Sequence, residues 1–157
     1  MAIEKVKAYF SQWNMENKIQ EFEVSSATVE LAALALKCEP ERIAKSLSFM
    51  INEKAVLVVT AGDAKIDNKK YKEKFGAKAK MLTPDRVREL IGQAVGGVCP
   101  FGINEGVPVY LDKSLKRFKT VFPACGSSNS AIELSIPELE KYSGYAEWVD
   151  VCKGWNV

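Results

Sequence analysis

Residues 96–102, Gly-Gly-Val-Cys-Pro-Phe-Gly, combine three glycines and one proline between two apolar segments. Glycine lets the backbone approach a ligand closely and adopt a positive φ, and proline fixes the next bend. Such a loop can direct several N–H groups toward one point, which suits an anion or a polarised carbonyl. Because glycine and proline also cluster in ordinary turns at strand ends, a second feature is needed before this loop predicts a site.

Lysines supply that second feature. Lys45 stands at the junction of a predicted helix and strand, and residues 65–80 contain seven lysines against Asp67 and Glu73, a local charge of +5 on a chain of net charge +2. A basic segment on a nearly neutral protein is typical of a surface that binds a phosphate backbone. A solvated helix face has the same composition and stays open as an alternative. Together, the loop and the lysines indicate a site for phosphates and carbonyls.

The chain has no histidine, which excludes Ser-His-Asp and Cys-His nucleophile systems, histidine-ligated metals and an imidazole base. Its four cysteines form no CxxC motif and are expected to be free thiols, so the sequence predicts no metal site and no cofactor. Cys99 and Cys125 each lie in a loop of small residues, and a thiol nucleophile at one of them is an open alternative.

The length of 157 residues, with 47% hydrophobic and 27% charged residues, predicts one globular domain over residues 1–157. The apolar runs are far shorter than the ~20 residues that a membrane span needs. The N-terminus lacks the core of a signal peptide, so we expect a cytoplasmic protein without membrane contact.

Hydrophobic periodicity predicts helices that alternate with strands. Helices are expected at residues 3–16, 28–36, 68–75, 83–91, 114–118 and 135–142, and strands at 19–24, 47–51, 55–60, 107–111, 121–122, 131–134 and 146–151. Several connections are too short for a βαβ crossover. The predicted fold is therefore a mixed α/β domain whose twisted sheet is mostly antiparallel and is surrounded by helices.

The order of these pieces resembles the YbaK/EbsC family of aminoacyl-tRNA deacylases, which is related to the editing domain inserted in prolyl-tRNA synthetases. The pieces are Lys45 before an apolar strand pair, Val-Thr-Ala-Gly-Asp at residues 59–63, a lysine-rich helix, the loop at 96–102 and a small-residue loop before Ile-Glu-Leu at 132–134. The resemblance covers about residues 21–151 and implies a half-closed sheet. It also implies trans-editing, the hydrolysis of the ester between a wrong amino acid and the terminal adenosine of a tRNA, often the tRNA for proline.

The resemblance implies that activity depends most on Lys45 and that the 96–102 loop lines the pocket for the aminoacyl group. We expect catalytic roles for Lys45, Gly97 and Gly102, with Lys45 as a cation at the terminal phosphate, the ribose or the developing charge, and with loop N–H groups polarising the carbonyl. No protein base is evident in the sequence. The free ribose hydroxyl, or a water held by backbone carbonyls, would then serve the attack.

Substrate contacts are expected from both loops and from the end of the strand pair, at Thr60, Asp63, Gly96, Val98, Cys99, Pro100, Phe101, Gly126, Ser127 and Ser128. Some of these residues have structural alternatives. Asp63 and Asp67 could cap the following helix, Phe101 could pack beneath its turn, and the serines could form a local turn. The tRNA acceptor stem or its CCA end is expected to bind at Lys65, Lys69, Lys70 and Lys72.

Two other functions stay open at this stage. One is a tRNA- or nucleotide-binding module that keeps the pocket without turnover, and the other is the thiol-dependent enzyme that would use Cys99 or Cys125. The expected partner is an aminoacyl-tRNA, an aminoacyl-tRNA synthetase is a candidate second partner, and a monomer is the expected state.

Overall fold

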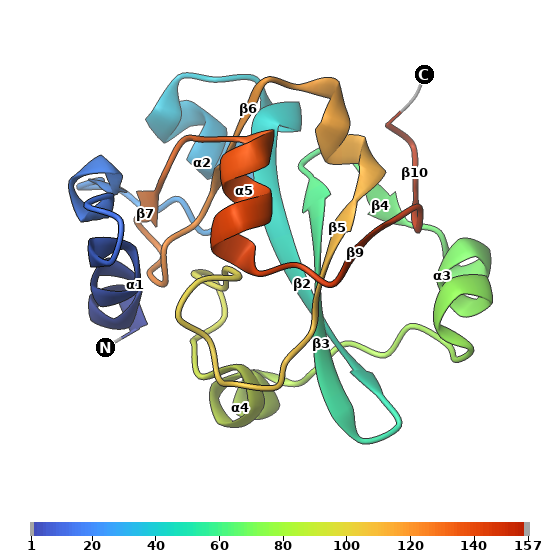
Figure 1. The fold of residues 1–157 in the computed structure, drawn as a ribbon. Coiled ribbons are helices and arrows are strands. Elements are labelled where there is room, and N and C mark those ends of the chain that lie inside the picture. The colour runs from blue at the N-terminus through green and yellow to red at the C-terminus, as the bar shows by residue number, and fades with distance from the viewer. Residues whose placement is uncertain (1, 156–157) are drawn as a thin grey trace.

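A computed structural model describes residues 2–155, which fold around a curled six-stranded sheet with the order β8-β6-β2-β3-β5-β9 (Figure 1). The strands are β2 (Ile43–Ile51), β3 (Lys54–Ala61), β5 (Val109–Asp112), β6 (Thr120–Pro123), β8 (Leu134–Ser135) and β9 (Glu147–Val149). Pairing is antiparallel for β2/β3 and β6/β8, and parallel for β2/β6, β3/β5 and β5/β9. The expected mixed, half-closed sheet surrounded by helices is confirmed, and the β2/β3 hairpin is its longest ladder.

Two short antiparallel pairs flank this sheet. They join β1 (Gln20–Glu21) to β7 (Ser130–Ala131) and β4 (Lys65–Ile66) to β10 (Cys152–Lys153). The strand expected at 19–24 is therefore reduced to two residues, because the backbone after it bonds to a loop instead: the Phe22 N–H donates to the Asn129 carbonyl and the Ser26 N–H to the Ser128 carbonyl. The strand expected at 131–134 divides into β7 and β8.

The helices are α1 (Ala2–Ser11), α2 (Val29–Leu36), α3 (Asn68–Phe75), α4 (Pro84–Arg86), which continues as a π-helical turn η3 (Val87–Ile91), and α5 (Ile136–Ser143), with short 3-10 turns η1 (Glu16–Lys18), η2 (Pro40–Arg42) and η4 (Lys113–Arg117). The helices α2, α3, α4 and α5 begin where the sequence places capping residues. The Thr28 hydroxyl accepts from the Leu31 N–H at the start of α2, and Ser135 and Glu138 form a capping box on α5. The first helix ends at Ser11 rather than near residue 16, because Asn14 takes a φ of 58° in the following turn.

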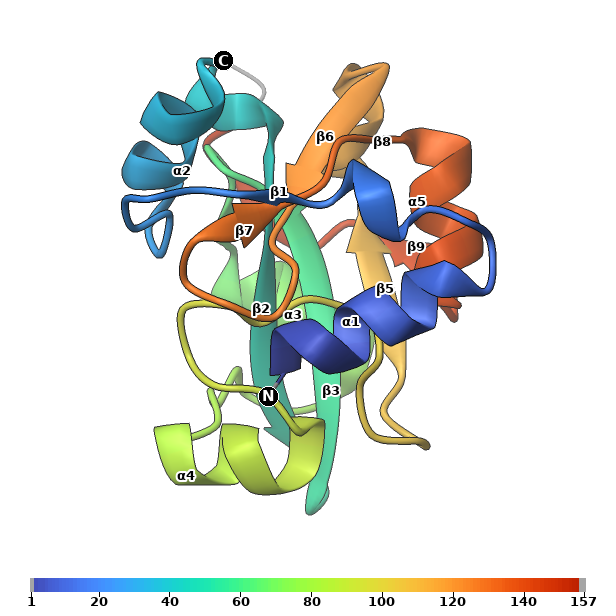
Figure 2. The same cartoon turned by 90° about the vertical axis from the view of Figure 1, so that its left-hand side faces the viewer.

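The hydrophobic core lies on both faces of β3, which is buried from its second residue to its end. Against one face, Phe10 of α1 packs on Phe101 and Tyr142, with ring centroids 4.7 and 5.4 Å apart. On the other face, Phe49 packs on Tyr71 of α3. Figure 2 shows α2 and α4 at opposite ends of the same side of β2. No helix among residues 2–155 is long and apolar enough to cross a membrane.

Candidate functional site

A cavity of about 420 Å³ lies between α2, the outer edge of β2, α4 and the 96–102 loop. Its lining includes Ser26, Ala27, Thr28, Val29 and Ala32 around the start of α2, residues 43–48 of β2, Met81, Leu82, Pro84 and Val87 around α4, Val95, Gly96 and Val98 of the loop, and Phe122, Ala124, Ser130 and Ala131. Lys45 and the first part of the glycine loop, about fifty residues apart in the sequence, thus meet at one hollow.

The cavity exists because β2 lacks a strand neighbour along part of its outer edge. Strand β6 pairs with Ile43 and Ala44 only. Farther along, the Leu82 N–H donates to the Ser48 carbonyl at 3.1 Å and the Met50 N–H to the Lys80 carbonyl at 2.8 Å. In an antiparallel ladder every second residue points its main-chain groups away from the partner strand. The Ser46 N–H and carbonyl have the same outward direction as those of Ser48 and therefore face the cavity edge.

Lys45 sits half-buried on β2, directly opposite Thr60 of β3. Its ammonium lies 3.5 Å from the Gly62 carbonyl oxygen, and within the described residues it takes part in no ion pair. Burial lowers the pKa of Lys45 below its ordinary value of 10.5, while Cys152 and Asp63 oppose that shift. A half-buried cation without a carboxylate partner can stabilise negative charge on a ligand more strongly than a solvated lysine.

The first part of the glycine loop borders the cavity and is fixed by backbone packing. Gly96 has a φ of +99°, which favours glycine. A Cβ at Gly97 would lie 2.5 Å from the Ser127 nitrogen, and the Gly97 carbonyl accepts from the Gly126 N–H at 2.9 Å. The Gly97 N–H itself donates to the Ala94 carbonyl. Within residues 2–155, the N–H groups of Gly96 and Val98 have no protein acceptor, so both are available donors in the part of the loop that borders the cavity.

The second part of the loop turns away from the cavity. Phe101 is fully buried against Phe10, Pro100 is buried, and a Cβ at Gly102 would lie 3.1 Å from the Lys5 carbonyl oxygen in α1. Cys99 is fully buried, and its N–H donates to the Gln93 side chain at 2.9 Å. The structure therefore does not place these four expected site residues on the cavity wall.

Polar residues at the end of β3 and at the start of α3 also have other partners. Asp63 forms a two-pronged ion pair with Arg117, at 3.0 and 2.5 Å. Thr60 is fully buried and its hydroxyl donates to the Ala61 carbonyl. Asp67 caps α3 by accepting from two backbone N–H groups, as one of the two sequence alternatives predicts. None of the three belongs to the cavity lining.

The second small-residue loop supports the first one from behind. Gly126 packs against Ala2 and Val6 of α1 with a φ of +92°. Ser127 donates to Ser130 at 2.7 Å, and the Ser128 carbonyl accepts from the N–H of Ser26. The wall of the cavity is formed instead by neighbours of these residues, Ala124, Ser130 and Ala131.

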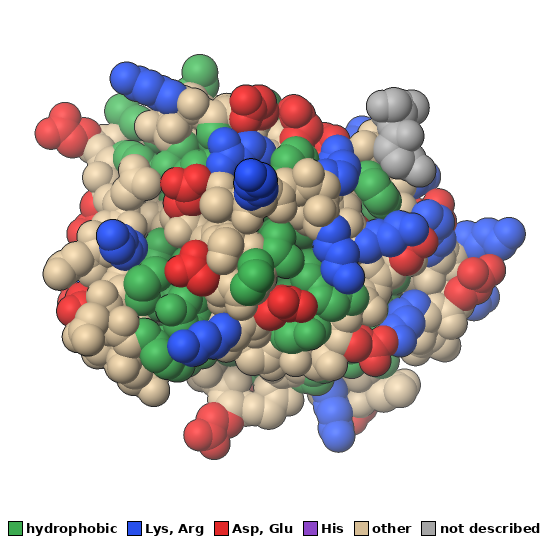
Figure 3. Space-filling view, turned by 45° about the horizontal axis from the view of Figure 1, so that its top comes forward, with side chains coloured by type: hydrophobic (Ala, Val, Ile, Leu, Met, Phe, Trp, Pro, Cys, Tyr) green, Lys and Arg blue, Asp and Glu red, His purple; other side chains and the backbone are tan. Residues whose placement is uncertain are grey.

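The lysines of α3 and β4 lie outside the cavity. Lys65, Lys69 and Lys72 are exposed, whereas Lys70 binds Asp150 at 3.2 Å and also the Cys152 carbonyl. Figure 3 shows that basic side chains gather toward the side that carries α3 and β10, with acidic ones among them. Lys65 is close enough to Lys45 to contribute to the lowering of its pKa, so the basic side and the cavity are electrostatic neighbours.

Two serines of β2 line the cavity and were not among the residues expected from the sequence. The Ser46 hydroxyl is buried and has no hydrogen-bond partner among the described residues, and Ser48 follows it on the same face of the strand. An unpartnered buried hydroxyl on the strand residue that follows Lys45 is a group that a ligand could satisfy. The sequence feature that could have identified them is Ser-Leu-Ser at residues 46–48, which places two polar side chains on one face of an otherwise apolar strand.

The chain is similar to known proteins over most of its length. A family model described as an aminoacyl-tRNA editing domain matches residues 23–142. A protein of Bacillus subtilis (strain 168), described as uncharacterized protein YwhH, is 56% identical over 157 residues, which cover 99% of this chain and all of that protein.

A longer protein matches over a part of its length. The proline–tRNA ligase of Geobacillus sp. (strain WCH70) is 28% identical over 125 residues, which cover 79% of this chain and 22% of the ligase.

A solved structure matches over nearly the whole chain. The crystal structure of a proposed trans-editing enzyme for prolyl-tRNA synthetase superimposes with a TM-score of 0.87, at 30% identity over 98% of each chain. The chain belongs to the aminoacyl-tRNA editing domain family, with the YbaK-like fold that its sequence pattern indicated.

Proposed function

We propose that this protein hydrolyses mischarged aminoacyl-tRNA in trans, and that the tRNA for proline is its substrate. The observation that carries the proposal is that Lys45, Ser46, Gly96 and Val98 line one cavity, where the Ser46 main chain faces outward and the N–H groups of Gly96 and Val98 have no acceptor among residues 2–155. Its volume of about 420 Å³ is in the range of small-molecule sites. Membership of the editing domain family supports the same reaction.

In the proposed reaction, a water oxygen attacks the ester carbonyl and the bond between that carbonyl and the ribose oxygen breaks. The products are the free amino acid and a tRNA with its terminal hydroxyl restored. Lys45 and the N–H groups at the cavity edge would stabilise the negative charge that develops on the carbonyl oxygen. The substrate's free ribose hydroxyl would take part in activating the water, since the chain has no histidine.

The cavity wall also bears on the amino acid that is removed. Ala27, Val29, Val87 and Val98 are apolar, and Ser46 and Ser48 are the hydroxyl groups nearest to Lys45 along β2. We infer a small uncharged aminoacyl side chain, because a buried charge without a partner would be costly there. In the cell such a reaction takes place where charged tRNA is used, which places the protein in the cytoplasm, and a synthetase is the candidate source of its substrate.

The test is a panel of tRNA for proline charged with alanine, cysteine, serine, threonine or proline. We expect the purified protein to release at least one of the small non-cognate amino acids well above the spontaneous rate, and to spare the prolyl ester. A protein that binds these tRNAs without accelerating release from any of them would instead be the binding module that keeps the pocket without turnover.

The thiol-dependent alternative predicts inactivation by alkylation, and the structure argues against it. Burial raises the pKa of Cys99 to about 11 and that of Cys125 well above its ordinary value, so both thiols stay protonated at neutral pH. We expect iodoacetamide to label Cys38, which is partly exposed, before Cys99 or Cys125, and deacylation to persist in the labelled protein. Peptide mapping with an activity assay checks this, and substrate-protected inactivation through Cys99 or Cys125 would favour the thiol mechanism.

Binding of the tRNA is expected to depend on salt through the exposed lysines beside the cavity. Each phosphate contact that Lys65, Lys69 or Lys72 neutralises should contribute about 0.7–0.9 to the slope of log affinity against log salt. Replacing all three with alanine should therefore flatten the slope, and fluorescence anisotropy at several salt concentrations measures it. Replacing Lys18, Lys37 and Lys54, which lie outside this basic segment, is the control. An unchanged slope in the first variant would remove α3 and β4 from the binding face.

A further inference from the structure

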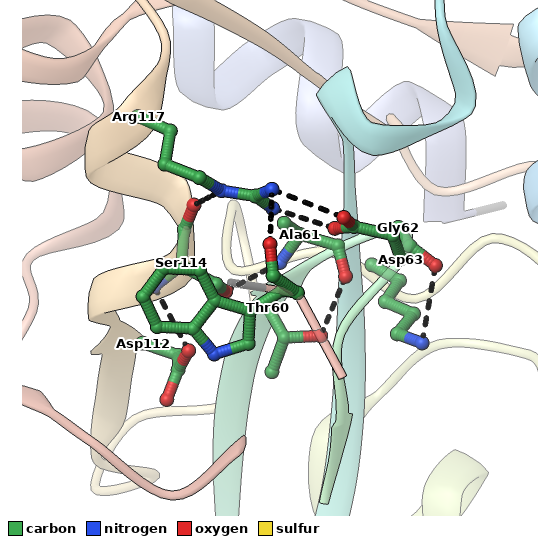
Figure 4. A network of polar contacts seen from close by, with 9 residues as sticks. Thr60, Ala61, Gly62, Asp63, Asp112, Ser114 and Arg117 are labelled. Atoms are coloured by element: carbon green, nitrogen blue, oxygen red, sulfur yellow. Dashed lines mark hydrogen bonds and ion pairs between the residues drawn. The ribbon is translucent and has the colours of Figure 1, made fainter. Parts of the chain in front are cut away.

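A partly exposed network of polar contacts surrounds the turn that follows β3. Arg117 binds both oxygens of Asp63, donates from Nε to the Ser114 carbonyl at 2.9 Å, and donates to the Trp155 carbonyl at 2.9 Å. Figure 4 shows the Arg117 guanidinium directed at Asp63, with Ala61 and Gly62 beside it. Both side chains of this ion pair are only 27% exposed, so it is screened less by solvent than a surface pair.

The same network continues into β3 and η4. The Ser114 hydroxyl accepts from the Ala61 N–H at 3.1 Å, and the fully buried Asp112 accepts from the N–H groups of Ser114 and Val151. Arg117 is thus anchored by η4 on one side and bound to the turn on the other. The contacts that hold the Arg117 side chain involve no residue of the cavity lining.

The end of the Lys45 side chain contacts the same turn. The ammonium lies 3.5 Å from the Gly62 carbonyl oxygen, and Asp63 is the next residue along the chain. Gly62 cannot shift easily, because a Cβ there would lie 2.0 Å from the Pro40 carbonyl oxygen and 2.9 Å from Val29. The carbonyl that contacts Lys45 is therefore held by packing from η2 and α2, and the carboxylate beside it is held by Arg117.

Asp63 is the carboxylate that would compete with a substrate for Lys45. Cys152, Lys65 and Glu30 also influence the Lys45 charge, and among these groups Asp63 belongs to the turn that the ammonium contacts. Arg117 occupies both carboxylate oxygens of Asp63, which leaves Lys45 with a long contact to a neutral carbonyl instead of an ion pair. A two-pronged arginine–carboxylate pair has a defined direction that a lysine does not reproduce.

We propose that Arg117 is a positioning residue for Lys45: by engaging both oxygens of Asp63, it keeps that carboxylate from drawing the Lys45 ammonium away from the cavity. This inference rests on the proposed role of Lys45 in ester hydrolysis. It assigns Arg117 no contact with the substrate.

The test breaks the same ion pair from its two ends. Arg117→Ala frees the Asp63 carboxylate, and we expect deacylation under single-turnover conditions to fall by about 10- to 100-fold, because a displaced catalytic group has effects of this size. Asp63→Ala leaves no carboxylate to capture Lys45, so it should remain within a few-fold of wild type. The double variant Arg117→Ala/Asp63→Ala should recover most of the activity that Arg117→Ala loses.

A purely structural ion pair gives a different pattern. Either single variant would then lower activity and thermal stability to a similar extent, and the double variant would be no better than Arg117→Ala; that result would overturn the proposal. Arg117→Lys should retain only part of the wild-type deacylation activity, because a lysine keeps the charge and loses the two-pronged geometry.

A measurement without substrate separates this inference from the proposed function. NMR titration of the labelled Lys45 side chain should give a higher pKa in Arg117→Ala than in wild type, because the freed Asp63 carboxylate favours the charged ammonium. Asp63→Ala should not raise it. If no tRNA is deacylated but the pKa of Lys45 rises in Arg117→Ala, the proposed reaction is wrong and the positioning role of Arg117 is supported. If the pKa of Lys45 is the same in all variants, the positioning role of Arg117 is wrong.

Discussion

Replacing Lys45 with alanine is expected to slow single-turnover deacylation by about 100- to 1,000-fold, the range seen when one group that stabilises an oxyanion is removed. The physical reason is that Lys45 is the half-buried cation on the cavity wall and has no carboxylate partner within the described residues. Lys54→Ala, at the exposed start of β3, is the matched control and should keep wild-type activity. If Lys45→Ala stays within a few-fold of wild type, the role assigned to this lysine is wrong.

The pH dependence of the same reaction separates a cationic role from a basic one. Burial lowers the pKa of Lys45 below 10.5, so the ammonium loses its proton at a lower pH than a solvated lysine does. After subtraction of spontaneous hydrolysis, activity should therefore fall on the alkaline side before pH 10.5. Lys45→Arg keeps its charge throughout this range and should move the fall to higher pH. Activity that rises as Lys45 deprotonates would mean that the neutral amine acts as a base.

Gly97→Ala is expected to have the second large effect, on both stability and activity. The added methyl group would lie 2.5 Å from the Ser127 nitrogen and 2.7 Å from the Gly126 carbonyl carbon, which are backbone atoms that cannot rotate away. We expect a loss of about 2–3 kcal/mol in the free energy of unfolding, typical of overpacking in a rigid site. Since the two loops must separate, Gly96 and Val98 would also move at the cavity, and deacylation should fall in the variant that remains folded.

Gly106→Ala is the control for Gly97→Ala. Gly106 has a φ of +85°, and a methyl group added there would meet nothing within 4 Å, so its cost is the backbone strain of roughly 1–2 kcal/mol and no collision. Urea unfolding and single-turnover deacylation measure both variants. Equal activity in Gly97→Ala and Gly106→Ala would show that the packing of the two loops does not position the site.

Local signals explain why so much of the fold could be predicted. Thr28, Asp67, Thr83 and Ser135 each cap the helix that their sequence context indicates, because a cap depends on residues two or three positions away. The short strands were less predictable. β1 and β7 depend on a partner more than a hundred residues away, and two-residue pairings leave no hydrophobic period to detect.

The order of Lys45 and the glycine loop along the chain led to a candidate site, and Lys45, Gly96 and Val98 line one cavity in the structure. Their roles in the reaction stay a prediction. Composition could not show which way each peptide of the loop faces, so Phe101 and Gly102, which pack under α1, were expected in the site together with Gly96, Gly102 as a catalytic residue and the other two as substrate contacts. Asp63 differs for another reason: its partner Arg117 is 54 residues away, and such an ion pair leaves no local pattern.

The most direct test of the account is a crystal structure of the protein with an alanyl group joined by a stable amide to 3′-amino-3′-deoxyadenosine. We predict that the acyl carbonyl oxygen lies within hydrogen-bond distance of the Lys45 ammonium or the Ser46 N–H, with the aminoacyl group against Gly96 and Val98. A complex in which the aminoacyl group lies outside this cavity, with Lys45 still on the Gly62 carbonyl and making no contact with it, would contradict the account.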